Sequence, residues 1–127
     1  MQIGGVTVYR VDAQHGENEE TVARMGLGSG FVFVCADEKI VYLAGDTVFY
    51  DGVRTVIDRF HPDIVIVNAC DARGKIGRLI MNAEDVKKTC DCKPDSFVIA
   101  SHMDTVTHAH LNREHLSKEL AGTQYAK

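Results

Sequence analysis

Three short apolar runs, separated by segments with helical spacing, constrain the fold of this 127-residue chain most strongly. The runs are Ile40–Ala44, Ile64–Val67 and Phe97–Ala100. A continuous apolar run of this length is typical of a strand that is buried on both faces, as in a parallel sheet. Between the first two runs, apolar residues recur from Val53 to Phe60 at the i, i+3, i+4, i+7 spacing of an amphipathic helix. The second half of the chain therefore predicts alternating strands and helices.

The first part of the chain predicts strands without an intervening helix. Val6–Val11 alternates in polarity, as a half-buried strand does, and Phe31–Cys35 is a second apolar run. The polar residues 36–39 fit a hairpin turn into the strand at Ile40–Ala44. The acidic stretch His15–Glu20 is expected to be a loop. Together the two parts predict an α/β fold with a mixed sheet.

The helix boundaries also have local signals. His61-Pro62 is expected to end the first helix, because a residue before proline avoids the helical region. Asn82 can cap a helix over Ala83–Lys88, and a last helix is expected to begin near Asn112.

Bulk properties limit the classes of function. The length fits one domain over residues 1–127, and the net charge of -4 without a basic run argues against a nucleic-acid partner. We see neither a signal peptide nor an apolar run of the roughly 20 residues that span a membrane, so a cytoplasmic location is expected. Cys35 and Cys70 fit buried apolar positions, and Cys90 and Cys92 are closer together than the cysteines of common zinc knuckles.

Three potential metal ligands follow three predicted strands. His15 follows the first strand, Asp46 follows Ile40–Ala44 in the sequence Gly45-Asp46-Thr47, and His102 follows Phe97–Ala100. Imidazole and carboxylate groups suit zinc, and also manganese or iron, and a catalytic zinc keeps a fourth position for water. Taken singly, each residue also fits a plain role, as a solvated loop histidine or a helix-capping aspartate.

Several segments resemble the metallo-β-lactamase-fold hydrolases. Tyr42–Thr47 is similar to the hydrophobic-hydrophobic-x-Gly-Asp-Thr segment of that superfamily. Val98–Met103 looks like its later strand-then-His motif, and Ala13–Gly16 like an earlier His motif. The likeness is closest to ascorbate-lactonase-like members and covers nearly the whole chain.

The resemblance implies roles for these residues. Asp46 would bridge two metals and take part in hydrolysis with metal-bound hydroxide. His15 would bind the first metal and His102 the second, with one or two zinc ions, or manganese or iron, as the cofactor. Residues close to the ligands or to a substrate pocket would be Asn68, Asp71, Asp104 and His108.

One expected motif of the superfamily is absent, the His-x-His-x-Asp-His string of its N-terminal half. The nearest approach, His108–Arg113, has Asn112 and Arg113 where Asp and His are required, and we interpret it as a coincidence. The chain thus resembles only the C-terminal half of a four-layer αββα sandwich. One half alone would expose the inner face of its sheet, which predicts either a homodimer or pairing with a complementing N-terminal half.

Three functional hypotheses follow. The first is a metal-dependent hydrolase of an ester, lactone or phosphoester, truncated and impaired, with a small-molecule substrate. The second is a non-catalytic binding or assembly module that dimerises through its exposed sheet face. The third is a flavodoxin-like domain with Asp46 and Asp71 at a magnesium-binding edge, which the opening run of strands disfavours.

Overall fold

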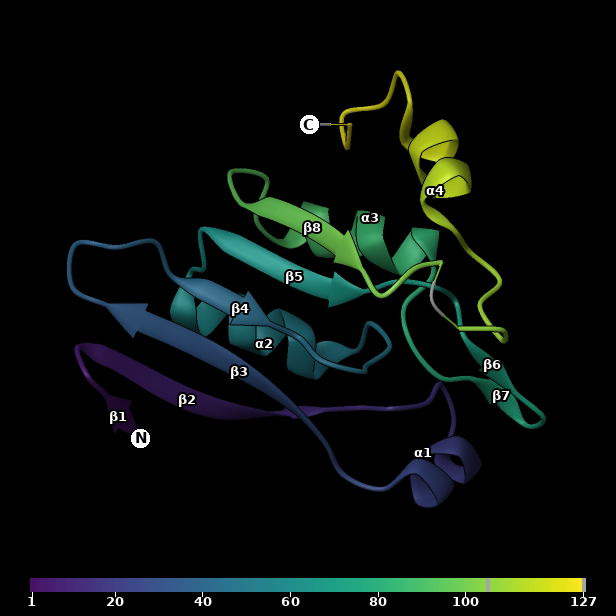
Figure 1. The fold of residues 1–127 in the computed structure, drawn as a ribbon, viewed down its shortest axis with the longest axis horizontal. Coiled ribbons are helices and arrows are strands. Elements are labelled where there is room, and N and C mark those ends of the chain that lie inside the picture. The colour runs from purple at the N-terminus through teal and green to yellow at the C-terminus, as the bar shows by residue number, and fades with distance from the viewer. Residues whose placement is uncertain (105, 127) are drawn as a thin grey trace.

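A six-stranded mixed sheet forms the centre of the computed structural model, which describes residues 1–104 and 106–126 (Figure 1). The strand order is β1-β2-β3-β4-β5-β8. Neighbours among β1 to β4 are antiparallel, and β4, β5 and β8 are parallel. The sequence predicted the parallel pairing and the hairpin between β3 and β4. The strands are β1 Gln2–Ile3, β2 Val6–Ala13, β3 Gly28–Cys35, β4 Val41–Leu43, β5 Ile64–Asn68 and β8 Phe97–Ser101.

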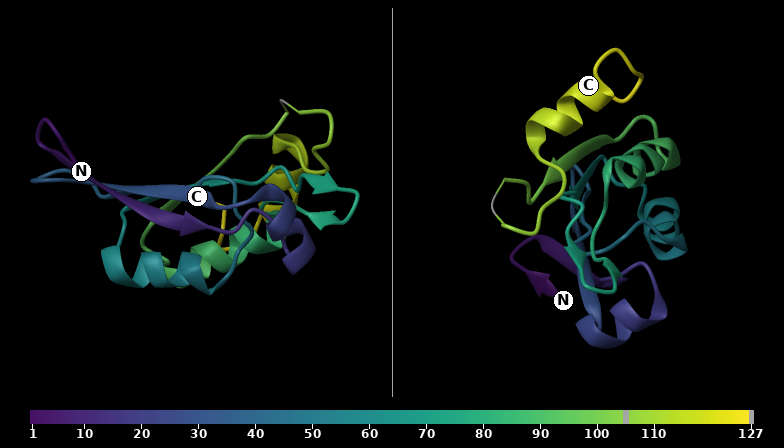
Figure 2. Two further views of the ribbon diagram at one scale, coloured as in Figure 1. Left: turned by 90° about the horizontal axis from the view of Figure 1, so that it is seen from below. Right: turned by 90° about the vertical axis from the view of Figure 1, so that its right-hand side faces the viewer.

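Two helices make the parallel connections, and both lie on the same face of the sheet (Figure 2). They are α2, Asp51–Phe60, and α3, Ala83–Cys92. The helix α2 ends before His61 as predicted, with His61 in a left-handed conformation, but it begins at Asp51, two residues before the predicted spacing starts at Val53. The helix α3 continues four residues beyond the predicted Lys88. Side chains from the strands and helices form one buried core between these layers, including Val32, Tyr42, Val53, Ile57, Val65, Val67, Met81 and Val86.

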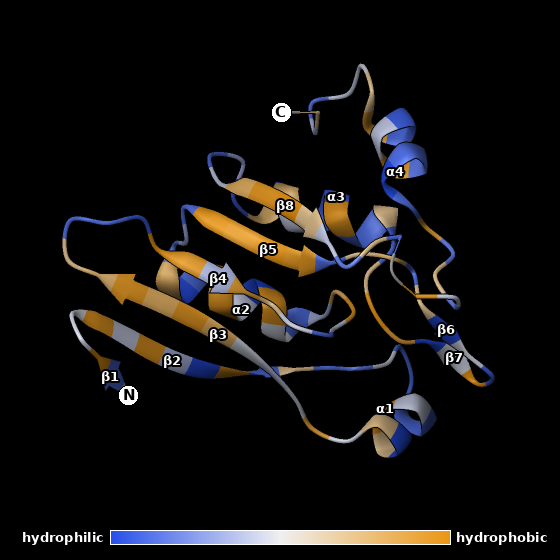
Figure 3. Cartoon of the chain, viewed as in Figure 1, coloured by the Kyte–Doolittle hydropathy of each residue, from blue (hydrophilic) through white to orange (hydrophobic). Residues whose placement is uncertain are grey.

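The other face of the sheet carries apolar side chains that no described element covers. The register aligns Val41 with Ile64 and Phe97 in one row across the sheet, and Leu43 with Ile66 and Ile99 in the next. Phe97 is 58% exposed and Ile99 is 48% exposed. We call this surface the open face; Figure 3 shows how apolar its strands are. A contiguous apolar surface of this kind is typical of an interface.

Four elements lie beyond the sheet and its two helices. The helix α4, Arg113–Leu120, begins next to Asn112 as predicted, and the Asn112 side chain caps it. The helix α1, Glu19–Met25, was not predicted, because a loop was expected up to Glu20. A reciprocal capping box between Asn18 and Thr21 lies at the start of α1 and stabilises this short helix. A two-stranded hairpin, β6 Arg73–Gly74 and β7 Gly77–Arg78, was also missed.

A second apolar cluster packs beside the ends of β5 and β8. It joins Cys70, Ile80 and Met103 to Leu111 and Leu116, and so fixes the start of α4 against the sheet. Within residues 1–104 and 106–126, none of the helices has the length and apolarity that a membrane crossing requires.

Candidate metal site at the strand ends

Four strands run in the same direction and end at one edge of the sheet. Since β3 is antiparallel to both β2 and β4, the strand β2 points the same way as β4, β5 and β8. His15 lies just beyond β2, Asp46 beyond β4, and His102 beyond β8, while Asn68 is the last residue of β5. In open α/β sheets this edge is where ligands usually bind. We call it the strand-end edge.

Hydrogen bonds connect the loop after β2, which contains His15, to the loop after β4, which contains Asp46. We call them the His15 loop and the Asp46 loop. The Gln14 amide donates to Thr47 Oγ1 over 3.0 Å, and the Val48 amide donates to the Gln14 carbonyl over 2.9 Å. Thr47 and Val48 are buried, so these bonds are shielded from water. The strand β3, which separates β2 from β4 in the sheet, therefore does not keep the two loops apart at this edge.

Asp46 has a side-chain partner on the neighbouring strand. The Asn68 amide nitrogen donates to Asp46 Oδ1 over 2.8 Å. One residue further on, the Ala69 amide donates over 3.0 Å to the carbonyl of Ser101, the residue before His102. Asn68 was a candidate for a residue close to the metal ligands, and this contact supports that role because it orients the carboxylate.

Left-handed backbone conformations gather at the strand-end edge. Gly45 has a φ of 72°, and Asp71, His102 and Asp104 have φ values of 50°, 61° and 64°. Such conformations are unfavourable for residues other than glycine and are frequent at functional sites. At Gly45 the requirement is also steric, because an added Cβ would lie 2.4 Å from the Ser29 carbonyl oxygen.

The donor chemistry suits a metal, but the described residues do not gather a complete ligand group. Within the described ranges, no three His, Cys, Asp or Glu side chains are placed together so that they could hold a metal ion. His15 and Asp46 are half-buried and His102 is exposed. The structure brings Asp46 and Asn68 together, while the convergence of His15, Asp46 and His102 on a cation stays a prediction.

The other candidates have different partners. Asp71 is buried and forms an ion pair with Arg73 at 2.8 Å, and Asp104 forms one with Arg113 at 2.8 Å. His108 is exposed in the segment before α4.

Among residues 1–104 and 106–126, no two cysteines form a disulfide. Burial raises the pKa of the Cys70 thiol, and the nearby Asp46 and Asp71 carboxylates raise that pKa further, so Cys70 stays protonated and apolar as expected.

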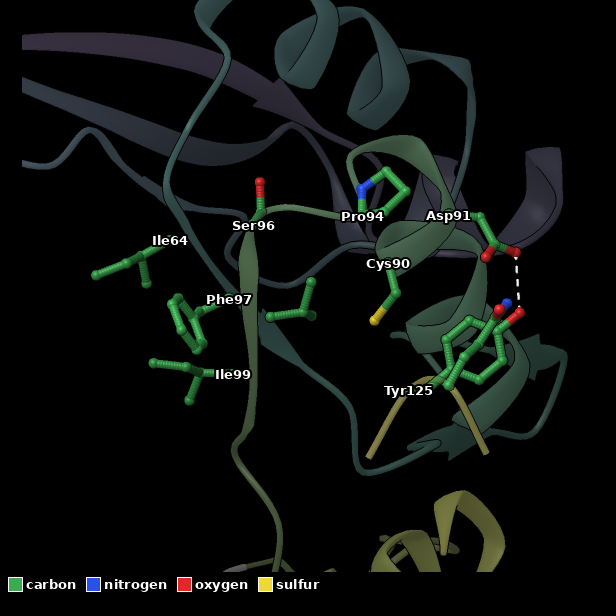
Figure 4. A pocket seen from close by; sticks show the side chains of 10 residues that line it. Ile64, Cys90, Asp91, Pro94, Ser96, Phe97, Ile99 and Tyr125 are labelled. Carbon is green, nitrogen blue, oxygen red and sulfur yellow. Dashed lines mark hydrogen bonds between the residues drawn. The ribbon is translucent and has the colours of Figure 1, made fainter. Parts of the chain in front are cut away.

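A cavity of about 530 Å³ lies away from this edge, where β5 and β8 begin (Figure 4). Its lining includes Ile64 and Phe97, and the Tyr125 hydroxyl donates to Asp91 Oδ2 over 3.2 Å at its border. None of the predicted ligands lines it. Sequence reasoning missed the cavity because it depends on how the C-terminal segment returns to the edge of β8.

Comparisons with known proteins confirm the expected kinship, although no family model matches the chain. The UPF0173 protein YddR of Bacillus subtilis is 38% identical over 113 residues, which is 88% of this chain and 44% of that protein. A UPF0173 metal-dependent hydrolase of Methanocorpusculum labreanum is 31% identical over 105 residues, 80% of this chain and 45% of that protein.

Solved structures agree with this assignment. An isothiocyanate hydrolase from Delia radicum gut bacteria superposes with a TM-score of 0.88 and 35% identity over 94% of this chain and 48% of that chain. A possible metal-dependent hydrolase from Veillonella parvula superposes with a TM-score of 0.90 and 32% identity over 98% of this chain and 50% of that chain. The metallo-β-lactamase fold protein YhfI of Bacillus subtilis, with a TM-score of 0.65 and 13% identity over 94% of this chain and 44% of that chain, supports the fold alone.

The chain therefore has the fold of part of a metallo-β-lactamase-like protein, and two of the relatives above are named as a metal-dependent hydrolase and a possible metal-dependent hydrolase. It spans about half the length of the curated relatives that it matches, as expected for the C-terminal half of the fold.

Proposed function

We propose that this chain contributes the strand-end edge to the active site of a metal-dependent hydrolase, with His15, Asp46 and His102 as metal ligands. The observation that carries the proposal is the common edge reached by β2, β4, β5 and β8, where Asn68 holds Asp46 by a 2.8 Å hydrogen bond. The names of the relatives support the same chemistry.

Each residue would have a distinct part. His15 and His102 offer imidazole nitrogens, and Asp46 offers a carboxylate whose Oδ1 is already oriented by Asn68. When bound, zinc lowers the pKa of a coordinated water to roughly 7 and so supplies hydroxide near neutral pH; manganese or iron could take its place. Asp46 would act as the catalytic carboxylate, and either one or two ions would fit this division of roles.

The substrate is proposed to be a small molecule with a hydrolysable centre, namely an ester, a lactone or a phosphoester. The isothiocyanate hydrolase among the structural relatives adds isothiocyanates to the compounds that should be tested.

The open face bears on how the site is completed. Phe97 and Ile99 are exposed there, and the described residues do not assemble three ligands by themselves. We propose that a second polypeptide surface packs on the open face and adds the missing donors, either a complementing N-terminal half or a second copy in a homodimer. A small-molecule hydrolase formed in this way would be impaired whenever this chain is alone.

Metal analysis tests the proposal directly. Protein purified without chelator, as a homodimer or together with a complementing half, should contain near-stoichiometric zinc, manganese or iron, and both His102→Ala and Asp46→Ala should lose it. His115→Ala is the matched control, because His115 is an exposed histidine of α4 that is not among the site candidates, and it should leave the metal content unchanged. Wild-type protein that neither contains nor takes up metal, alone or with a complementing half, would contradict the proposal.

A second candidate function is a non-catalytic assembly module that dimerises through the open face. The exposure of Phe97 and Ile99, together with the lack of an assembled ligand group in the described residues, favours it. A stable dimer that holds no metal and turns over no ester, lactone, phosphoester or isothiocyanate would support the module over the hydrolase.

A further inference from the structure

Asp85, in the first turn of α3, is a buried carboxylate that contacts more than its own helix. It is 3% exposed, its Oδ2 accepts from the Phe49 amide over 3.2 Å, and the Arg78 guanidinium donates to the same oxygen. The ammonium group of Lys88 lies 3.7 Å from Oδ1. A buried charge is tolerated only when it is paired and hydrogen-bonded, so these contacts fix where Phe49 and Arg78 lie.

Arg78 carries the connection to the loop that contains His15. Its Nε lies 3.5 Å from Glu17 Oε2, and its backbone amide donates to Glu17 Oε1 over 2.6 Å. In return the Glu17 amide donates to the Arg78 carbonyl over 3.0 Å. Glu17 is two residues beyond His15, so Asp85 reaches that loop through a single side chain.

Phe49 connects Asp85 to the Asp46 loop, because its amide bonds to Asp85 and it lies three residues beyond Asp46. We propose that Asp85 is a positioning residue which, through Arg78 and the Phe49 amide, sets how the His15 loop and the Asp46 loop lie relative to each other. The inference rests on the proposed function for the meaning of those two loops, but its geometry does not depend on a metal.

A purely local role for Asp85 predicts something different. A carboxylate in the first turn of a helix also stabilises that helix by interacting with its positive end. If that were its only role, replacing Asp85 would weaken α3 and the fold as a whole, and amide protection would fall evenly instead of falling first in the two loops.

Amide hydrogen exchange of the full chain separates these possibilities. The reporters are the Glu17 and Val48 amides, which bond to Arg78 and Gln14 carbonyls and not to Asp85 itself. In Asp85→Ala both amides should exchange roughly tenfold faster or more, the size expected when a hydrogen bond to a charged group is lost, while β5 amides stay protected. Arg78→Met removes only the connection to Glu17 and keeps the bond between the Phe49 amide and Asp85, so it should accelerate exchange of the Glu17 amide and leave the Val48 amide largely protected.

Asp85→Asn provides a finer test. It keeps an oxygen that can accept from the Phe49 amide but removes the charge that pairs with Arg78. The Val48 amide should therefore remain largely protected while the Glu17 amide exchanges faster.

Two controls guard against a general loss of stability. Glu114→Ala removes the ion pair with Lys118 on the exposed surface of α4 and should change neither reporter. Val65→Ala weakens the buried core and should accelerate exchange across the sheet without singling out the loops. Equal acceleration of loop and β5 amides in Asp85→Ala, or no change at the reporters, would overturn the inference.

Zinc titration by calorimetry separates this inference from the proposed function. If wild-type protein binds zinc, Asp85→Ala should bind it at least about tenfold more weakly although it removes no proposed ligand. Unchanged zinc affinity would overturn the positioning role at the metal site. If wild-type protein binds no zinc even with a complementing half, the proposed function fails, and the exchange experiment alone still decides whether Asp85 couples the loops.

Discussion

The two faces of the central sheet are made by the same strands but have opposite surroundings. On the covered face, Val65 of β5 is 1% exposed beneath the helices. On the open face, Phe97 and Ile99 of the adjacent β8 are 58% and 48% exposed. The side chains on both faces are apolar, so the composition of a strand does not decide which of its residues are buried. Burial depends on whether another layer packs on that face.

The difference has an energetic meaning. Burying one large apolar side chain contributes about 1.5–3 kcal/mol, and the covered face already has this stabilisation from α2 and α3. The open face can gain it only when another surface packs there. Under the proposed function, the surface that covers the open face would also add the missing metal ligands at the strand-end edge.

The largest expected effect comes from deleting a buried side chain beside the covered face. Ile57→Ala on α2 should lower the free energy of unfolding by about 2–5 kcal/mol, because Ile57 is 1% exposed. The matched change on the open face, Ile99→Ala, should cost less than about 1 kcal/mol in the isolated chain. Urea unfolding measures both, and equal costs would mean that the open face is already covered in solution.

A slightly smaller effect is expected at the strand-end edge. Gly45→Ala should cost about 2–4 kcal/mol, because it combines a left-handed backbone with a Cβ 2.4 Å from the Ser29 carbonyl oxygen. Gly122→Ala is the control, since Gly122 has a similar φ of 74° but no atom within 4 Å of an added Cβ, and it should cost only about 1 kcal/mol. Similar losses in thermal unfolding would show that the contact with Ser29 relaxes easily.

Charges on the open face should oppose association. If the open face is an interface, a variant with Phe97→Lys and Ile99→Lys should bind its partner or a second copy at least about tenfold more weakly in sedimentation experiments. Leu27→Lys is the control, because Leu27 is 95% exposed but lies outside the sheet pairing of the open face. A wild-type chain that stays a stable monomer at micromolar concentration and binds no complementing half would contradict the proposed use of this face.

The smallest effect is expected at Tyr42, in the core below the covered face. Its hydroxyl is buried and has no hydrogen-bond partner among the described residues, so Tyr42→Phe should be neutral or stabilise the fold by up to about 1 kcal/mol.

Burial also raises the pKa of the Tyr42 hydroxyl above its ordinary value. The folded state therefore keeps the proton longer than the unfolded state, and stability falls as pH rises beyond the unfolded value of about 10. Tyr42→Phe should lose less stability above that pH than the wild type; an identical alkaline decline in denaturant titrations would contradict this assignment.

Much of the fold could be predicted because its signals are local. The apolar runs at Ile64–Val67 and Phe97–Ala100, and the helical spacing from Val53 to Phe60, each specify an element within a few residues. The helix α1 and the hairpin β6–β7 were missed because they are short and polar. They are held by capping bonds of Asn18 and by contacts of Glu17 with Arg78, which cross 61 positions of sequence.

The candidate site divides in the same way. His15, Asp46 and His102 could be chosen as candidates from the sequence, because each follows a predicted strand. The hydrogen bond between Asn68 and Asp46, and the contacts of Asp85 with Phe49 and Arg78, join residues that meet only after folding.

The sequence by itself determined the mixed α/β class, the positions of the main strands along the chain and the residues at their ends. It could do so because periodicity and apolar runs specify each element within a short stretch of residues. Only the tertiary structure decided which face of the sheet is covered and which loops touch at its edge. Those outcomes depend on long-range packing and hydrogen bonding, for which no short stretch of the chain carries a signal.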